Sequence, residues 1–462
     1  MRGNFSRDGF DPLKGITRVL DQQGRVTLDS DANERQAIQL HLLRTLAADL
    51  IGPHGVIGDG FKIAKVEGLH WDVEITPGHY YVDGWLCENH EAVTWRGEDD
   101  HKRQPWLDEQ PQPRAGISYL AYLELWERYV CAAEQDGLLA PDAPGRLREV
   151  ALGGPDTVGK AQLIWQIRLR EAPPGAGEGT PEVNRANAEQ LLRQWNSASR
   201  GRLAARGRAP PGGDSDPCVV PPHASYRGIE NQLYRIEIYR GGSAKPAAGQ
   251  TQATFIWSRD NGSVVLPVES VSGERVQLAA GWRDARSDSA VGDHVEISDE
   301  AIRMNPGAGP IRRVTAYDPD SDTVMLDASP GPEVERTERG LALRRWDHRK
   351  GDPKSGYPAL ADHALQLVED EWLTIEDGIS ICFAPGTPTH TYRSGDYWLI
   401  PARVDLGDII WPRDADQGRT PRAVPPHGVD RHFAPLAMVT FAANGEASPS
   451  DLRRILRPLD ED

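Results

Sequence analysis

The sequence lacks the short motifs of the best-known hydrolase, nucleotide-binding and zinc-protease sites. No G-x-S-x-G, G-x-x-x-x-G-K-[ST], G-x-G-x-x-G or H-E-x-x-H pattern occurs in its 462 residues. We therefore expect a protein that is not an enzyme. We predict no catalytic residue, no cofactor and no bound metal.

Cysteine is also scarce, and its spacing excludes the usual uses of this residue. The four cysteines, Cys87, Cys131, Cys218 and Cys382, lie far apart and never form a C-x-x-C pair. Neither a disulfide framework nor a zinc ribbon is expected. We interpret these residues as reduced, structural thiols.

Long apolar runs and an excess of positive charge are missing as well. No run approaches the length of a membrane helix, and the first residues, MRGNFSRDGFDPLKG, contain no apolar segment of a signal peptide. The formal net charge of −17 opposes binding to nucleic acid or to an anionic membrane. We expect synthesis in the cytoplasm without a signal peptide, no direct membrane insertion and no nucleic-acid partner.

Turn-forming residues, by contrast, are abundant. The chain has 46 Gly and 36 Pro, and 39% of its residues are hydrophobic, which is typical of a globular protein built from short elements joined by frequent turns. Its length also exceeds that of one ordinary core. The predicted fold class is mainly β with a few helices, in several domains: antiparallel sandwiches or small barrels, one N-terminal helix and a helical connector.

The N-terminal region, residues 1–60, is predicted to form a β-hairpin followed by a helix. Apolar pairs flank a Gln-Gly turn, Asp31 and Glu34 fit a capping box, and Gly52 with Pro53 ends the helix. Strand addition and helix docking both create interfaces, so we interpret the region as an assembly element, although packing within the chain's own core explains it equally well. The interface candidates are Val19, Leu20, Val26, Leu28, Leu40, Leu43, Leu46 and Leu50.

Most of the remaining chain alternates short strands with polar turns. Residues 117–130, ISYLAYLELWERYV, are predicted to form a strand, with Tyr119, Ala121, Leu123 and Leu125 on one face.

The other segments follow in sequence. A helix is expected from Pro181 through Trp195, a small barrel or sandwich around residues 292–327, and a Ser-capped helical turn at residues 448–458. The predicted segments are 1–60, the hairpin and helix; 61–171, a β domain; 172–217, a Pro/Gly-rich helical connector; 218–345, a β barrel or sandwich; and 346–462, a C-terminal β domain with a short terminal helix.

The stretch FIWSRDNGSVVLPVE, residues 255–269, raises the question of a catalytic loop. Asn261 and Gly262 suit the positive φ angles of a type I′ turn, and Arg259 and Asp260 most simply pair, or bond across the strand ends. A catalytic Arg/Asp pair would need a third group, which the sequence does not show. We therefore predict a β-hairpin.

Three polar patterns have both a functional and a structural interpretation. Residues 29–34, DSDANE, and 318–323, DPDSDT, have the alternating oxygen side chains of a calcium loop, but a helix N-terminus and a hairpin turn need the same residues. His79, Cys87 and His90 lie within one predicted meander, but they match no zinc-finger spacing. We favour the structural interpretation for each pattern.

Acidic residues and tryptophans also have two interpretations. Residues 369–372, EDEW, and 375–378, IEDG, supply carboxylates near a tryptophan, as glycoside hydrolysis requires, but nothing in the sequence selects one pair. The tryptophans suit a sugar-stacking surface, yet this residue more often fills β cores and subunit interfaces, which we favour. The tryptophans concerned are Trp126, Trp257, Trp282, Trp346, Trp398 and Trp411.

Several longer motifs resemble a family of proteins encoded with the genes of contractile injection systems, the phage-tail-like particles. The resemblance rests on FSRDGFDPLKGITRVLDQQGRVTLDSDANERQ, ATFIWSRDNGSVVLPVE, YRSGDYWLIPAR, GDIIWPRD and PPHGVDRHFAPLAMV. It covers most of the chain in order and is interrupted mainly at residues 172–217. The segment ITPGHYYVDGWL is also similar to β-hairpins of phage baseplate and tail-fibre proteins.

The resemblance implies a structural subunit that is associated with the baseplate or spike and acts by oligomeric assembly. The implied partners are further copies of the chain, related by three-fold or six-fold symmetry, and baseplate, spike or sheath proteins of a particle that is released or anchored. The alternative is a cell-surface protein that binds or cleaves carbohydrate.

The two hypotheses predict different structures. A structural subunit predicts buried tryptophans and large apolar patches on the isolated chain. Sugar binding predicts exposed, coplanar tryptophans, and sugar cleavage predicts two carboxylates in a cleft, one of them with a raised pKa.

Overall fold

The computed structural model describes most of the chain and groups it into two compact units. The described residues are 1–97, 104, 111–136, 138, 147–173, 183–196, 201–207, 225–279, 291–305, 307–335, 340–348, 358–386, 389–414 and 420–456. Unit 1 comprises Met1–Asp8, Tyr129–Gln162 and Ser199–Val429, and unit 2 comprises Gly9–Arg128, Leu163–Ala198 and Asp430–Asp462. Both units are mainly β, as the sequence predicted.

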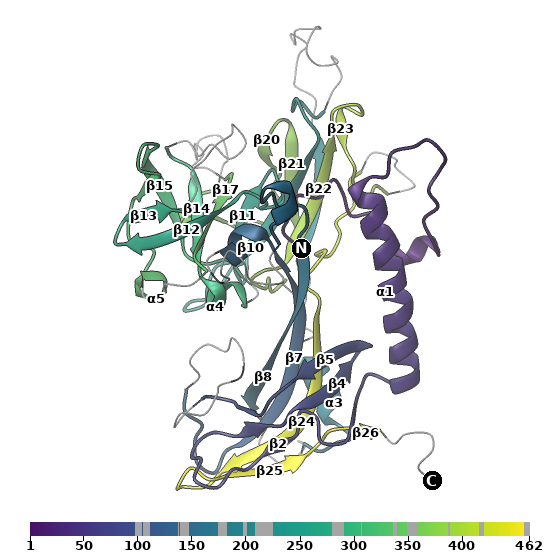
Figure 1. The fold of residues 1–462 in the computed structure, drawn as a ribbon, viewed down its shortest axis with the longest axis vertical. Helices are drawn as coiled ribbons and strands as arrows, with labels where there is room; N and C mark the ends of the chain where they lie inside the picture. The colour runs from purple at the N-terminus through teal and green to yellow at the C-terminus, as the bar shows by residue number, and fades with distance from the viewer. Residues whose placement is uncertain are drawn as a thin grey trace. The chain divides into compact units, whose positions relative to one another are not determined.

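Over its described residues, unit 2 contains three sheets and two α-helices. Both helices, α1 and α3, are labelled in Figure 1. The sheets have the strand orders β26-β1-β4-β5, β2-β3-β6 and β25-β24-β7-β8. The elements are η1 (Pro12–Lys14), α1 (Asp29–Ile51), α3 (Ala188–Asn196), β1 (His54–Ile57), β2 (Ile63–Ala64), β3 (Glu74–Ile75), β4 (Gly78–Val82), β5 (Trp85–Asn89), β6 (Val93–Thr94), β24 (Arg431–Phe441), β25 (Ala447–Asp451) and β26 (Ile455–Leu456), with nearly all of β7 (Ser118–Val130) and most of β8 (Lys160–Glu171).

Unit 1 contains a closed six-stranded barrel, β12-β13-β16-β15-β14-β17, and two open sheets, β18-β19-β11-β10-β22-β23 and β20-β21-β9. Of the two predicted alternatives, a small barrel or a sandwich, the structure shows the barrel, which runs from β12 to β17. The elements are α2 (Ala132–Asp136), η2 (Val150–Leu152), α4 (Glu300–Arg303), α5 (Pro332–Glu335), β9 (Arg202–Gly207), β10 (Gln232–Arg240), β11 (Thr254–Ser258), β12 (Val265–Ser272), β13 (Arg275–Leu278), β14 (His294–Ser298), β15 (Ile311–Asp318), β16 (Thr323–Leu326), β17 (Ala342–Trp346), β18 (Leu360–Ala361), β19 (Ala364–Gln366), β20 (Leu373–Glu376), β21 (Ile379–Ala384), β22 (Tyr397–Arg403) and β23 (Asp408–Ile409).

Local sequence signals explain several of these elements. The Asp83-Gly84 pair joins β4 to β5 as a two-residue hairpin loop in which both residues have positive φ, the conformation that Asp-Gly favours. The helix α1 ends at Ile51, where Gly52 has a φ of 88° and Pro53 follows. These predicted stops and turns are therefore confirmed.

Strand β7 shows how the core of unit 2 is built. The four alternate residues that were expected on one face of this strand are all part of one buried cluster with residues of β4, β8 and β24. Leu120, on the opposite face, packs in a second cluster with Leu192 of α3. The strand is therefore covered on both faces, and shortening a side chain such as Leu123 to Ala would cost about 2–5 kcal/mol.

The predicted N-terminal hairpin is wrong, because residues 16–28 contain no strand. The chain that precedes α1 instead contacts this helix at two places: the Phe10 and His41 rings lie 5.4 Å apart, and Arg35 Nη2 lies 2.7 Å from Asp21 Oδ2. A two-stranded ribbon alone buries too little apolar surface to be stable. The helix itself is confirmed, although it begins at Asp29 and its Asp31 carboxylate accepts a hydrogen bond from Leu28 N.

The predicted hairpin over residues 255–269 is also wrong, although its turn is correct. Asn261 and Gly262 have φ values of 52° and 62°, and Ser263 N donates to Asp260 O, as in a type I′ turn. The flanking strands do not pair with each other, because β11 pairs with β10 and β19, whereas β12 pairs with β13 and β17. The turn therefore connects an open sheet to the barrel.

Two further local predictions need correction. The segment expected to end in a Ser-capped helical turn forms β25 and β26 over its described residues, because β24 and β1 offer edges for pairing. The helix expected from Pro181 begins at Ala188, and Pro181 lies outside the described residues.

The proposed connector also contains β9, which pairs with β21 in unit 1. The predicted segments run consecutively along the chain, whereas both units are discontinuous.

Candidate functional site

The helix α1 exposes a row of leucines, Leu40, Leu43, Leu46 and Leu50, which we call the leucine face. These side chains are 36%, 62%, 56% and 77% exposed, respectively. Their spacing of three and four residues places them on one side of the helix. All four were interface candidates, so the structure gathers half of the predicted set on one surface.

The opposite side of α1 is held by unit 2. Ile38 is buried there, and the Arg44 guanidinium lies 3.1 Å from the centre of the Trp85 ring and forms an ion pair of 3.0 Å with Glu127. Gly84 lies under the backbone of Arg44, where a Cβ atom would come within 2.0 Å of the Arg44 carbonyl oxygen. One side of the helix is thus packed, and the leucine face is turned away from this contact.

The other four interface candidates lie in the loop that precedes α1. Leu20, Val26 and Leu28 are exposed, and Val19 is half-buried. Exposed leucines are costly, because full burial of one such side chain is worth about 1.5–3 kcal/mol. Burial of the exposed surface of these four leucine side chains by a partner would therefore contribute on the order of 5 kcal/mol to the free energy of association.

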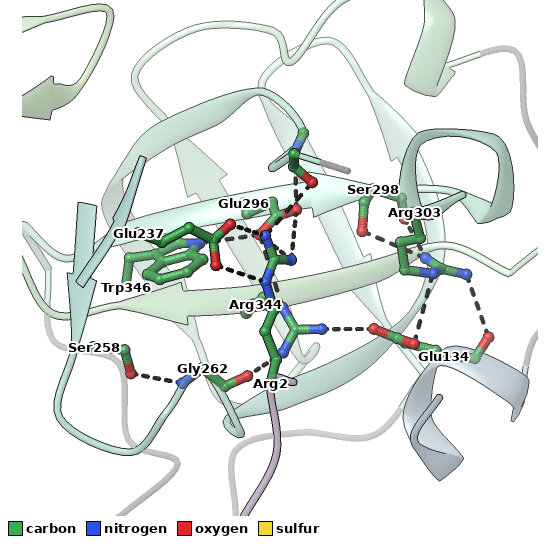
Figure 2. A network of polar contacts seen from close by, with 12 residues as sticks. Arg2, Glu134, Glu237, Ser258, Gly262, Glu296, Ser298, Arg303, Arg344 and Trp346 are labelled. Atoms are coloured by element: carbon green, nitrogen blue, oxygen red, sulfur yellow. Dashed lines mark hydrogen bonds and ion pairs between the residues drawn. The ribbon is translucent and has the colours of Figure 1, made fainter. Parts of the chain in front are cut away.

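The interior of unit 1 contains a network of charged side chains (Figure 2). At its centre, Glu237 on β10 accepts two hydrogen bonds from the Arg2 guanidinium and lies 2.5 Å from Arg235 Nε. Arg2 also lies 3.3 Å from Glu296 on β14. Glu237 and Glu296 are each about 1% exposed. Their negative charges are therefore stabilised by the neighbouring guanidinium groups and not by water.

The same network extends to α2. Arg344 on β17 pairs with Glu134 at 2.6 Å and also donates to the Gly262 carbonyl, and Arg303 donates to the Gly340 carbonyl at 2.6 Å. Glu296 additionally accepts hydrogen bonds from Trp346 Nε1 and Gly309 N. Figure 2 shows Arg344 of the barrel and Arg303 of α4 both directed toward Glu134 of α2.

The pKa shifts in the network follow from its geometry. Burial alone would raise the pKa of Glu237, but Arg2 and Arg235 lower it to about 2. Burial lowers the pKa of Arg235, which Glu237 partly offsets. A carboxylate that is fixed and ionised by two guanidinium groups is suited to hold elements together, and it is not available to transfer protons.

The Asp-Asn-Gly turn belongs to this network, which answers the question that its sequence raises. Asn261 Nδ2 donates to the carbonyl oxygens of Met1 and Gly3, and Gly3 N donates to Asn261 O. Arg259 and Asp260, which were expected to pair or to bond across the strand ends, both contact charged groups of other elements: Arg259 lies 3.0 Å from Glu376, and Asp260 lies 3.4 Å from Arg345. The turn is a structural anchor for residues 1–3.

Glu376, in the IEDG segment, is a titratable group that the sequence did not single out from its neighbours. Burial raises its pKa to about 7, although Arg259 and Tyr234 act in the opposite direction. Its Oε1 accepts from the Tyr234 hydroxyl at 3.0 Å, and its Oε2 accepts from Arg259 at 3.0 Å. Because Arg259 also pairs with Asp347, we interpret the three residues as an ion-pair chain. Only the three-dimensional contact with Tyr234 and Arg259 distinguishes this carboxylate from the many others.

Each tryptophan of the predicted set that the structure describes is a core residue. Trp126, Trp257, Trp346, Trp398 and Trp411 are all buried. Trp282 lies outside the described residues.

The candidate metal patterns do not gather into sites. Within the described ranges, no three His, Cys, Asp or Glu side chains form a metal-binding group. DPDSDT is the turn between β15 and β16, and Asp318 accepts there from Asp320 N and from the Ser321 hydroxyl. His79 is exposed and pairs with Glu88, whereas Cys87 is buried in the core. Cys87, Cys131 and Cys382 are free thiols, and Cys218 lies outside the described residues.

In the part of the chain that the structure covers, no helix is long and apolar enough to cross a membrane. Searches of curated proteins and of solved structures find no match. A family model described as "Family of unknown function (DUF6519)" matches residues 1–188 and 171–446. Together these two matches extend over nearly the whole sequence, and the chain therefore belongs to the DUF6519 family.

Proposed function

We propose that this protein is a non-enzymatic structural subunit of a contractile injection particle, associated with the baseplate or spike, and that it acts by assembly. The observation that carries the proposal is the leucine face on α1. An apolar row of this kind on a solvent-facing helix is typical of a surface that another protein covers. The resemblance of the sequence motifs to proteins encoded with such particles supplies the context.

Two further observations support an assembling protein. The described tryptophans of the predicted set are buried, as expected for a structural subunit. The charged groups in the interior of unit 1 are bound to one another: Glu237 holds Arg2 and Arg235, and Arg344 holds Glu134. Removing one member of such a pair leaves an uncompensated buried charge, so these groups are engaged with one another in the folded chain.

The carbohydrate hypothesis receives less support. Sugar stacking needs exposed rings, and the five described tryptophans of that set are in the core. Cleavage needs a carboxylic acid that is free to donate its proton. Glu376 has a raised pKa, but both of its oxygens are engaged, one by Tyr234 and one by Arg259.

The proposal is tested on sheathed particles purified from the native organism. Mass spectrometry would compare the amount of this chain with the amounts of sheath and spike proteins. We expect a constant ratio for the unmodified chain, and a loss of at least about tenfold for a chain carrying Leu43→Glu and Leu50→Glu, because each charge would have to be desolvated in the interface.

A matched control separates the interface from a general effect of added charge. Leu152 on η2 is 67% exposed, like the leucine face, but lies in unit 1. Leu152→Glu should enter the particles at the normal ratio. Absence of the unmodified chain from intact particles, or normal incorporation of the double variant, would contradict the proposal.

A further inference from the structure

Three histidines of unit 1 meet beside the barrel, and we call them the histidine cluster. His294 is the first residue of β14, His348 follows β17, and His363 lies in the two-residue turn between β18 and β19. The rings of His294 and His348 stack with their centres 4.6 Å apart, and the ring centre of His363 lies 5.8 Å from that of His294. His294 and His348 are 1% and 0% exposed, respectively. Two of the three imidazoles are therefore shielded from water.

We infer that the histidine cluster is an acid-sensitive latch. When His294 or His348 gains a proton, the β18–β19 hairpin detaches from the barrel while the rest of unit 1 stays folded. This inference goes beyond the proposed function and does not depend on it, because it concerns unit 1 and not the leucine face.

Hydrogen bonds determine which nitrogen of each buried ring carries a proton. His294 Nδ1 lies 2.8 Å from the His348 carbonyl oxygen, and His348 Nε2 lies 2.7 Å from the His363 carbonyl oxygen. A carbonyl oxygen only accepts hydrogen bonds, so both of these nitrogens must be donors. The remaining two nitrogens, His294 Nε2 and His348 Nδ1, are buried without a hydrogen-bond partner among the residues that the structure describes. The neutral form therefore satisfies the single donor of each ring.

A second proton on either ring would be unfavourable in the closed state. The new N–H group would be buried without an acceptor, and its charge would lie beside another imidazole. The other charged groups that act on the cluster are Asp327, after β16, and Arg313, on β15. They pair with each other at 3.6 Å, and Asp327 also lies 3.8 Å from His363 Nδ1. Burial lowers the pKa of both buried histidines, that of His348 to about 3.

The β18–β19 hairpin is held to the rest of unit 1 by few backbone contacts. Strand β18 lies at the edge of the six-stranded sheet, and β19 pairs with β11 through two residues, Leu365 and Gln366. The hairpin turn is fixed at the barrel by the bond from His348 to the His363 carbonyl. Edge elements with few ladder pairs belong to the parts of a fold that open at the lowest free energy. Loss of this bond should therefore release the hairpin first.

Buried apolar side chains keep the hairpin closed at neutral pH. Ala364 packs with Ile256 of β11 and Trp346 of β17, and Leu365 belongs to the core of the six-stranded sheet. Detachment would expose both hairpin residues and would free the edge of β11 that β19 covers in the closed state. An uncovered strand edge is available to pair with another strand. The latch would thus convert a fall in pH into a new pairing surface.

Hydrogen–deuterium exchange of the full-length chain between pH 7.5 and 5, measured by mass spectrometry, tests the inference. The reporter peptide covers residues 358–367, in which Gln366 N donates to Ala359 O and Leu367 N donates to Ala253 O. After correction for the intrinsic pH dependence of exchange, its protection should fall below pH 6.5 by about tenfold per pH unit for each histidine that is protonated on opening. At pH 5 it should exchange at least about tenfold faster than β10, residues 232–240, because the opening is local.

Two substitutions separate titration from hydrogen bonding. In His348→Gln the amide can still donate from the position of Nε2, and in His294→Asn the amide can still donate from the position of Nδ1, but neither group gains a proton in this pH range. In the double variant, the protection of residues 358–367 should change by less than about twofold between pH 7.5 and 5. His79→Gln, which removes an exposed histidine of unit 2, is the matched control and should keep the full response.

The possible results either support the latch or overturn it. Loss of protection at the same rate in residues 358–367 and 232–240 would overturn it, because acid would then unfold unit 1 as a whole. A full pH response in the folded double variant would also overturn it, because another group would be responsible. Circular dichroism checks that the variants are folded. If the double variant does not fold, the comparison of the two peptides in the unmodified chain still decides.

Discussion

The leucine face of α1 and the interior of unit 1 reverse the usual arrangement of apolar and charged residues. On α1, Leu43 and Leu50 are mostly exposed, whereas in unit 1 Glu237 and Glu296 are almost completely buried. In the interior, each charge has partners within the same chain, and the arrangement is complete without another protein. On α1 the leucines stay exposed in the single chain. The charges of unit 1 are thus paired within the chain, whereas we propose that the leucine face is covered when the protein assembles.

The largest expected effect comes from breaking the buried network. Glu237→Gln removes the negative charge between Arg2 and Arg235, so that the buried Arg235 loses this carboxylate and Arg2 keeps its ion pair with Glu296. We expect a loss of about 3–5 kcal/mol in the free energy of unfolding, measured by urea denaturation. The matched control is Glu88→Gln, which removes an exposed ion pair with His79 and should cost less than about 1 kcal/mol. Equal effects of the two substitutions would show that burial does not govern the network.

A second prediction concerns acid sensitivity in unit 1. Burial, aided by His294, lowers the pKa of His348 to about 3, and the two rings stack at 4.6 Å, with His363 and Asp327 nearby. Because the unfolded chain binds a proton below about pH 6.5 and the folded chain does not, stability should fall as the pH drops below 6.5, by up to about 1.4 kcal/mol per pH unit.

The variant His348→Gln isolates this contribution. Its overall stability is expected to be lower, but the slope of stability against pH between 6.5 and 5 should be reduced by about the amount that one histidine contributes. Urea denaturation at several pH values measures both quantities. An unchanged slope would mean that His348 is protonated in the folded protein.

Glu376 should have a smaller effect with the opposite sign. Its pKa is raised to about 7 in the folded protein, so the unfolded chain loses this proton at lower pH than the folded chain does. Stability should therefore decrease as the pH rises from about 4.5 to 7. Glu376→Gln should remove this decrease, which is about 3 kcal/mol, whereas Glu371→Gln, at an exposed neighbouring position, should preserve it. Thermal unfolding across this pH range provides the comparison.

The smallest effect on folding is expected at the leucine face. Leu43→Glu should change the free energy of unfolding of the monomer by less than about 0.5 kcal/mol, because the side chain is already 62% exposed. Leu123→Glu, which introduces a charge at a fully buried position of β7, should prevent stable folding. Urea denaturation at concentrations below the association range measures the first variant. A large loss for Leu43→Glu would indicate a role in the core.

The parts of the fold that the sequence predicted correctly depend on local chemistry. Asp83-Gly84 fixes its hairpin because these residues accept positive φ, and Gly52 and Pro53 end α1 for similar reasons. The alternation in β7 placed Leu123 and its neighbours on the core face. Such features need only a few consecutive residues, so a single sequence is sufficient to reveal them.

The incorrect predictions concern contacts between distant parts of the chain. The type I′ turn at Asn261 was correct, but its two strands join different sheets because β10, β19, β13 and β17 supply better edges. Likewise, β26 pairs with β1 from the other end of the sequence. Strand pairing of this kind depends on long-range burial that no local pattern records.

The candidate site was predicted in part for the same reason. The leucine face followed from helical spacing, which is local. The buried charges were missed because Arg235 and Glu237 alternate with apolar residues in β10, a pattern that indicates solvent-facing positions on a half-buried strand. Arg235 on the same strand and Arg2, more than 200 residues away in sequence, together compensate the Glu237 charge in the core.

The most direct test is sedimentation velocity of the full-length chain over a range of micromolar concentrations, with the Leu43→Glu and Leu50→Glu double variant beside it. We predict that the unmodified chain sediments increasingly as a dimer or larger assembly as its concentration rises, and that the double variant remains monomeric with unchanged stability. A monomeric unmodified chain at every concentration, or an equal degree of association in both proteins, would contradict the proposal that copies of the chain assemble through the leucine face.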